Sequence, residues 1–182
     1  MDCFPEIGPS HKERPLLADV LACVHKWVSF SDAYVIYDSD RMPFTQSDVQ
    51  NALVGRSRYL GVLVRGTEVF GSFHPAVFRR TTADSGWTHD DRFFVFRLVT
   101  QGRLVAERYF KRPDVYCHLR SMRYVTEDKT FYRVNNAFFL TAPMSVRNNG
   151  FWGDFFNDYT PSGPEEWRMS FALDRLVVFQ LL

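Results

Sequence analysis

Two short apolar runs separated by a turn-forming tripeptide constrain the fold of this chain most strongly. Residues Tyr59–Val64 read YLGVLV and residues Glu68–Phe73 read EVFGSF, so both runs are rich in β-branched and aromatic residues. Such residues favour strands. Arg65-Gly66-Thr67 lies between the runs and is typical of a tight turn. The pattern therefore predicts a β-hairpin.

Gly71 is an unusual residue for the interior of this hairpin. Glycine has no side chain to pack and loses much backbone entropy on folding, so it weakens a strand. A β-bulge, a crowded packing site or a bound ligand would each explain a glycine here. The sequence around Gly71 does not by itself choose among the three.

Two segments in the first third of the chain have helical patterns. Apolar residues of Leu16–Phe30 recur three and four positions apart after Pro15, which predicts an amphipathic helix. In Phe44–Gly55, Thr45 is a plausible N-cap, Asp48 follows three residues later, and Gly55 suits the helix end. This pattern predicts a second, shorter helix.

The rest of the chain is predicted to be mostly strand. Loops are expected at Gly86–Asp91 and over Met144–Glu166, where Asn, Gly, Asp and Pro are frequent. The expected strands, besides the hairpin, are Tyr34–Tyr37, Arg92–Val99, Leu104–Phe110, Val115–Arg120, Phe131–Asn135, Ala137–Thr141 and a β-rich end at Met169–Leu182. Two helices ahead of many strands predict an α+β, mostly β fold, with helices against a two-sheet core. Residues 1–14 are expected to be a loose lead-in, and residues 15–182 a single domain.

Composition excludes several classes of protein. Basic and acidic residues nearly cancel, at 22 against 21, which argues against a dedicated surface for nucleic acid or anionic membranes. The short basic clusters Arg79-Arg80 and Arg120/Arg123 are therefore expected to be solvated surface. The three cysteines are widely spaced, no signal peptide is evident, and no apolar run is long enough for membrane insertion. These features predict a cytoplasmic protein with reduced thiols.

Candidate chemistry is sparse. Cys117 and His118 alternate in an expected strand and so point to opposite faces, which does not favour a Cys-His pair. Asp38/Asp40 and Asp90/Asp91 could act as acids or bind a cation, but Asp38-Ser39-Asp40 is more simply a turn. No phosphate-binding or nucleophile motif is found. We therefore expect no catalytic, cofactor or metal site.

The order of motifs resembles a TLDc domain, especially the diverged TLDc-like proteins of protists. The resemblance begins with the strand, turn, capped helix and hairpin of residues 34–73, and the second strand of the hairpin contains the FG pair Phe70-Gly71. It continues with a strand of the form FxFxL, in which the matching residues are Phe94, Phe96 and Leu98, and with a closing strand at Arg175–Leu181. In all, it covers roughly residues 30–182.

This resemblance implies a fold and a function. The implied fold is a sandwich of two antiparallel β-sheets flanked by helices, in which Gly71 is structural and lets a neighbouring element approach closely. The implied function is non-catalytic interaction with protein, linked to the oxidative stress response and to regulation of the vacuolar proton-pumping ATPase. Phe151, Trp152 and Phe155 are the candidate interaction surface, unless these rings fold back over a sheet edge.

Two other functions stay open at this point. The first is a hydrolase or thiol-dependent enzyme that uses Cys117 or the Asp38/Asp40 pair. The second is a redox sensor that uses Cys3, although no resolving cysteine lies near it in the sequence.

Overall fold

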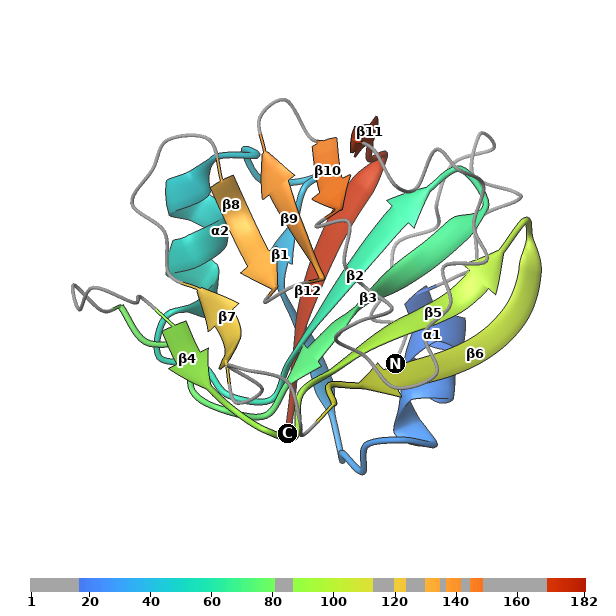
Figure 1. The fold of residues 1–182 in the computed structure, drawn as a ribbon, viewed down its shortest axis with the longest axis horizontal. Helices are drawn as coiled ribbons and strands as arrows, with labels where there is room; N and C mark the ends of the chain where they lie inside the picture. Colours follow the sequence, from blue (N-terminus) through green and yellow to red (C-terminus); the bar gives the residue numbers. More distant parts are fainter. Residues whose placement is uncertain are drawn as a thin grey trace.

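The fold is a two-sheet antiparallel β-sandwich flanked by two helices, as the sequence predicted (Figure 1). The structure is a computed structural model. It describes residues 17–80, 87–112, 120–123, 130–134, 137–141, 145–148 and 170–182.

The first sheet has the strand order β1–β12–β2–β3–β5–β6, and every neighbouring pair is antiparallel. Its strands are β1 (Ala33–Asp38), β2 (Tyr59–Arg65), β3 (Glu68–His74), β5 (Phe94–Thr100), β6 (Arg103–Phe110) and β12 (Arg175–Leu181). The predicted hairpin is confirmed, since β2 pairs with β3 from Tyr59 opposite His74 to Arg65 opposite Glu68. The closing strand β12 lies between β1 and β2, one strand in from the edge of the sheet (Figure 1).

The second sheet has the order β11–β10–β9–β8–β7–β4 and is also antiparallel. Its strands are short: β4 (Trp87–His89), β7 (Arg120–Arg123), β8 (Thr130–Val134), β9 (Phe138–Thr141), β10 (Ser145–Asn148) and β11 (Ser170–Ala172). Two loop predictions were wrong here. Residues 87–89 of the expected Gly86–Asp91 loop form an edge strand, and residues 145–148 of the expected Met144–Glu166 loop pair with both β9 and β11. Pairing with neighbouring strands overrides the weak local preference of such short segments.

Both predicted helices are present. Helix α2 (Gln46–Leu53) starts as the sequence indicated, because the Thr45 side chain accepts a hydrogen bond from the Asp48 backbone N–H. Helix α1 (Leu17–His25) is shorter than its apolar pattern. Trp27 and Val28 lie beyond its end but still pack against the same apolar cluster as the helix.

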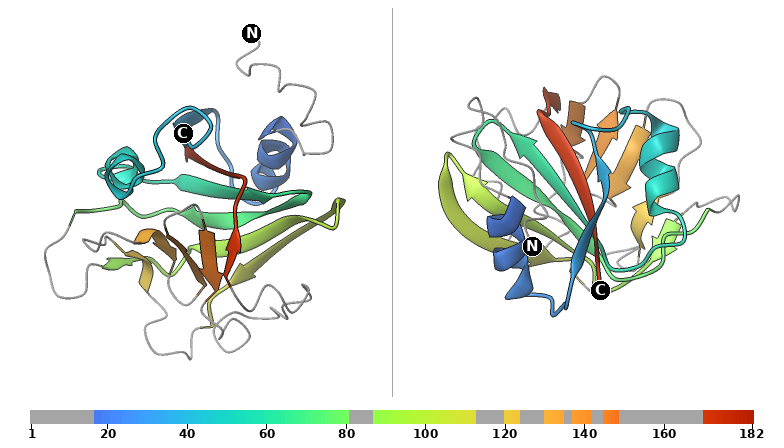
Figure 2. Two further views of the ribbon diagram at one scale, coloured as in Figure 1. Left: turned by 90° about the horizontal axis from the view of Figure 1, so that it is seen from above. Right: turned by 180° about the vertical axis from the view of Figure 1, so that it is seen from behind.

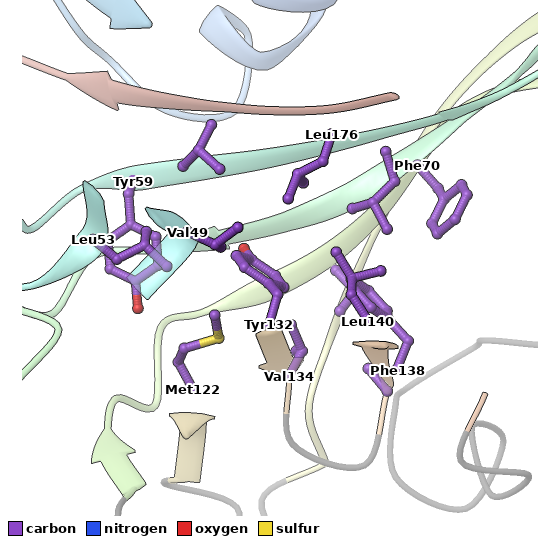
Figure 3. Packing of buried hydrophobic residues seen from close by; sticks show 14 of the residues in the cluster. Val49, Leu53, Tyr59, Phe70, Met122, Tyr132, Val134, Phe138, Leu140 and Leu176 are labelled. Atoms are coloured by element: carbon purple, nitrogen blue, oxygen red, sulfur yellow. The ribbon is translucent and has the colours of Figure 1, made fainter. Parts of the chain in front are cut away.

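The first sheet has an apolar core on each of its faces. Seen from above, it lies between α1 and the second sheet (Figure 2). One core fills the space between the two sheets and includes Val49 and Leu53 of α2. Side chains from the second sheet, among them Tyr132 and Leu140, extend in it toward Phe70 and Leu176 of the first sheet (Figure 3). The other core lies between the first sheet and α1, whose Val20 and Val24 are buried.

The geometry at Gly71 accounts for the glycine in β3. A Cβ atom at this position would lie 1.9 Å from the carbonyl oxygen of Gly61 and 2.6 Å from the ring of Phe96. Phe96 belongs to the core beneath α1, and its ring contacts Trp27 at a centroid distance of 6.1 Å. Gly71 therefore permits a close approach between strands and rings, which is the structural explanation among the three that the sequence left open.

Candidate interaction surface

A buried chain of polar groups links the two sheets. The Ser72 hydroxyl lies 3.0 Å from the Tyr132 hydroxyl of the second sheet and 2.9 Å from Nε2 of His74. Gly61, opposite Ser72 in β2, makes room for this contact, since a Cβ there would lie 2.3 Å from the Tyr132 hydroxyl oxygen. Tyr132 thus enters a socket in the first sheet formed by Gly61 and Ser72.

His74 is held in this core as a neutral side chain. Its ring stacks on Phe93 at a centroid distance of 5.6 Å and on Tyr59 at 5.0 Å, and it has no exposed surface. Burial lowers the pKa of His74 to about 3 and raises the pKa of both Tyr59 and Tyr132. A histidine with so low a pKa stays uncharged at neutral pH, so its role here is to pack and to accept or donate one hydrogen bond.

The Asp38/Asp40 pair is tied to an arginine from the other end of the chain. Nε and Nη2 of Arg175 donate to the two carboxylate oxygens of Asp38 at 2.9 and 2.6 Å, and Nε also lies 3.1 Å from Asp40. The Asp40 backbone N–H donates to Asp38, which is the turn that the sequence favoured. Burial alone would raise the pKa of Asp38, but the hydrogen bonds from Arg175 and Asp40 and the nearby positive charges outweigh it, and the pKa is lowered. Asp38 and Arg175 form a buried ionic clamp that joins the end of β1 to the start of β12, and the exposed Asp40 lies beside it.

Asp90 also has a structural role. Its carboxylate accepts hydrogen bonds from the backbone N–H groups of Ala76 at 2.6 Å and Arg92 at 2.9 Å. It thereby joins the segment after β3 to the segment before β5. Asp91, its neighbour in sequence, is exposed.

The outward face of the second sheet presents a different arrangement. Met122, Tyr132 and Val134 point into the core (Figure 3). Because successive strand residues point to opposite faces, their neighbours Arg123 and Arg133 point away from the first sheet. The guanidinium carbon of Arg123 lies 5.9 Å from the Trp87 ring centroid, and that of Arg133 lies 5.7 Å from it. We call Trp87, Arg123 and Arg133 the tryptophan–arginine cluster.

Pairing between strands aligns the tryptophan–arginine cluster. Trp87 of β4 is opposite Arg123 of β7, and Arg123 is opposite Arg133 of β8. All three side chains are half-buried. Sequence reasoning missed this cluster, because its members come from three strands and Trp87 was assigned to a loop. The available signal was alternation, since Arg133 stands between two apolar residues of an expected strand.

The family-motif residues lie in the core. Phe70 belongs to the core between the sheets, whereas Phe94, Phe96 and Leu98 belong to the core beneath α1, on the face of Gly71. The candidate surface residues Phe151, Trp152 and Phe155 lie outside the described residues, as do Cys3 and Cys117. Their predicted roles stay predictions.

Comparisons with known proteins leave the family open. No model of a known protein family matches this chain, and no curated protein matches it. Within the described ranges, no three His, Cys, Asp or Glu side chains gather so that they could hold a metal ion. Neither of the helices described is long and apolar enough to span a membrane.

Proposed function

We propose that this chain is a non-catalytic protein-interaction module of the TLDc type. The observation that carries this proposal is the tryptophan–arginine cluster on the outward face of the second sheet. Tryptophan and arginine are the residues most enriched among those that dominate binding energy at protein interfaces. A half-buried ring flanked by two guanidinium groups supplies a rigid apolar anchor and directional donors in one place.

The buried polar groups His74 and Asp38 are held in structural contacts, which is consistent with this proposal. His74 is locked between two rings, and Asp38 is neutralised by Arg175. A general acid or base needs a pKa near the working pH, whereas the pKa of each of these groups is lowered from its ordinary value. The enzymatic alternative through Asp38 and Asp40 therefore has no observation in its favour.

The partner we propose is a subunit of the vacuolar proton-pumping ATPase, in the context of the stress response. This follows from the resemblance of the motif order to TLDc domains and not from the sandwich fold, since one fold serves many functions. A cytoplasmic location is part of the same proposal.

Affinity capture with the tagged chain tests this proposal. Membrane and cytosolic extracts would be probed for proton-pump subunits with wild-type chain, with a Trp87→Ala/Arg123→Gln variant, and with a Phe151/Trp152/Phe155 triple-alanine variant. Leu104→Ala/Arg103→Gln is the control, because it removes one large apolar side chain and one arginine at exposed positions of β6.

We expect pump subunits with the wild type and the control, and a loss with the Trp87→Ala/Arg123→Gln variant. A loss with the triple-alanine variant instead would assign the contact to the aromatic loop. Absence of pump subunits with the wild type would disprove the proposed partner.

A further inference from the structure

We infer that β6 pairs with the same strand of a second copy of this chain, so that the first sheets of two copies join edge to edge. This surface is separate from the tryptophan–arginine cluster, which lies on the second sheet. Three features of β6 lead to the inference. They are an open strand edge, an exposed apolar side chain near its middle, and a charge pattern that is complementary to itself.

The first feature is the open edge. β6 is the outermost strand of the first sheet and, with eight residues, the longest strand in the described part of the chain. β5 pairs with one side of β6, and no strand within the described residues pairs with its other side. The backbone N–H and C=O groups on such a side can pair with another chain. At the opposite edge, β1 is shorter and its last two residues, Tyr37 and Asp38, are buried.

The second feature is Leu104, which is 65% exposed, the highest value among the large apolar residues described. It lies opposite Val99, which belongs to the core beneath α1, so Leu104 is on the α1 side of the sheet. Between Leu104 and Glu107, β6 has one residue more than β5, and Ala106 there has a φ of +50°. An alanine held in this strained conformation is a reason to look for a function at that position.

The third feature is the charge pattern. Glu107 accepts a hydrogen bond from Tyr109, which belongs to the core between the sheets, so Glu107 lies on that face of β6. Arg103 lies on the same face, because its neighbour Leu104 is on the α1 side. Antiparallel pairing about Val105 would place Arg103 of each copy opposite Glu107 of the other. Opposite charges directly across two strands stabilise their pairing.

The same register also suits the apolar residues. It places Leu104 of each copy opposite Ala106 of the other, which removes apolar surface from water, and places Val105 opposite itself. Moving the centre by one residue, to Ala106, would place Leu104 opposite Arg108 and would lose both charge pairs. The net charge of +1 adds little repulsion between copies. A second copy is therefore the occupant that the residues of β6 fit.

Sedimentation equilibrium over a range of protein concentrations tests the inference. We expect the wild type to form a dimer. Arg103→Glu should weaken the dimer at least about tenfold, because it places two carboxylates opposite each other at both ends of the pairing. Arg79→Glu is the control, since it makes the same change of charge at an exposed arginine outside β6, and it should associate like the wild type.

A charge exchange between copies tests the register. Glu107→Lys should also weaken the dimer, because Arg103 would then face a lysine. A mixture of the Arg103→Glu chain with the Glu107→Lys chain should associate again, since every facing pair in the mixed dimer is of opposite sign. Glu107 also accepts hydrogen bonds from Arg97 and Tyr109, so circular dichroism checks that each variant is folded.

A cross-link tests the register without changing Glu107. Residues directly opposite each other on antiparallel strands have Cα atoms about 4.5–5.5 Å apart, a separation that a disulfide can span. Under mild oxidation, Val105→Cys should therefore form a covalent dimer. Val77→Cys, at an exposed valine outside β6, is the control and should form little, as should the wild type.

Three results would overturn the inference. The first is a wild type that stays monomeric at every concentration. The second is an equal effect of Arg103→Glu and Arg79→Glu on the dimer. The third is a Val105→Cys variant that cross-links no faster than Val77→Cys. Leu104→Ala/Arg103→Gln should weaken the dimer and still capture pump subunits, because β6 and the tryptophan–arginine cluster belong to different sheets.

Discussion

At the scale of single residues, two glycines and a tyrosine determine how closely the layers approach. Gly71 admits the Gly61 carbonyl and the Phe96 ring on one face of the first sheet, and Gly61 admits the Tyr132 hydroxyl on the other. The two glycines are near neighbours on paired strands. An added methyl group would therefore meet either backbone or a buried ring, neither of which moves easily.

Replacing Gly71 with alanine should destabilise the protein by about 3 kcal/mol, because the new Cβ would clash with a backbone oxygen in a packed sheet. Urea denaturation measures the effect. The double variant Gly71→Ala/Phe96→Leu should recover little, since the clash at 1.9 Å is with Gly61 and not with the ring. Gly102→Ala is the control, because φ is +73° there and a Cβ would meet only the Thr67 side chain at an ordinary contact distance of 3.8 Å, so only about 1 kcal/mol should be lost. Equal costs for the two alanine variants would disprove the close-approach explanation.

At the scale of elements, the clamp between Asp38 and Arg175 holds an edge strand. Asp38 ends β1, which has β12 as its strand neighbour, and Arg175 begins β12. The two residues are 137 positions apart in sequence, so their contact depends on the assembled sheet. The clamp also includes a backbone link, because Leu176 and Ser39 exchange hydrogen bonds.

Substituting Asp38 with asparagine should cost about 3 kcal/mol, because it leaves a nearly buried guanidinium without its main partner. Thermal or urea unfolding measures the loss. Asp32→Asn is the matched control, since Asp32 is exposed and accepts a hydrogen bond from the exposed Tyr34, and it should change stability by less than about 0.5 kcal/mol. Asp38→Leu/Arg175→Met should be less destabilised than Asp38→Asn, because it leaves no unpaired charge. A cost for Asp38→Asn no larger than that of Asp32→Asn would contradict this account.

At the scale of the whole molecule, the chain Tyr132–Ser72–His74 joins the two sheets through the core. His74 contacts Tyr59 of β2, Phe93 before β5 and Tyr132 of β8. Protonating His74 would put a positive charge among aromatic rings, so stability should depend on pH.

The free energy of unfolding should decrease as the pH falls below 6.5, because the pKa of His74 is about 3 in the folded protein, against an ordinary value of 6.5. The unfolded chain then binds a proton that the folded protein does not, so stability is full above pH 6.5 and declines toward pH 3. The loss should reach about 2 kcal/mol at pH 5. The lowered pKa of Asp38 acts in a more acidic range, below its ordinary value of 3.8.

Urea denaturation between pH 7 and pH 5 measures this slope. The His74→Gln variant should be less stable at pH 7 but should lose less stability on acidification. His89→Gln, which replaces an exposed histidine, is the control. The same slope in the wild type and in His74→Gln would rule out His74 as the titrating group.

Much of the first sheet could be predicted from local patterns. The hairpin, the Thr45 cap and the long strand around Phe96 depend on neighbours within a few residues, and propensity and turn chemistry act over that range. The short strands β4 and β10 could not be predicted in this way. Three or four residues carry little propensity of their own, and these strands form because the backbone of a neighbouring strand pairs with them.

By itself, the sequence determined the fold class, the order of most elements and the structural character of the Asp38-Ser39-Asp40 turn. The tertiary structure alone decided which residues meet across the sheets. It brought Arg175 to Asp38, Tyr132 to Ser72, and Arg123 and Arg133 to Trp87. The physical reason is the distance along the sequence over which each kind of interaction acts. Strand and turn preferences arise from adjacent residues, whereas charge pairs, ring contacts and close packing arise only when distant strands lie side by side.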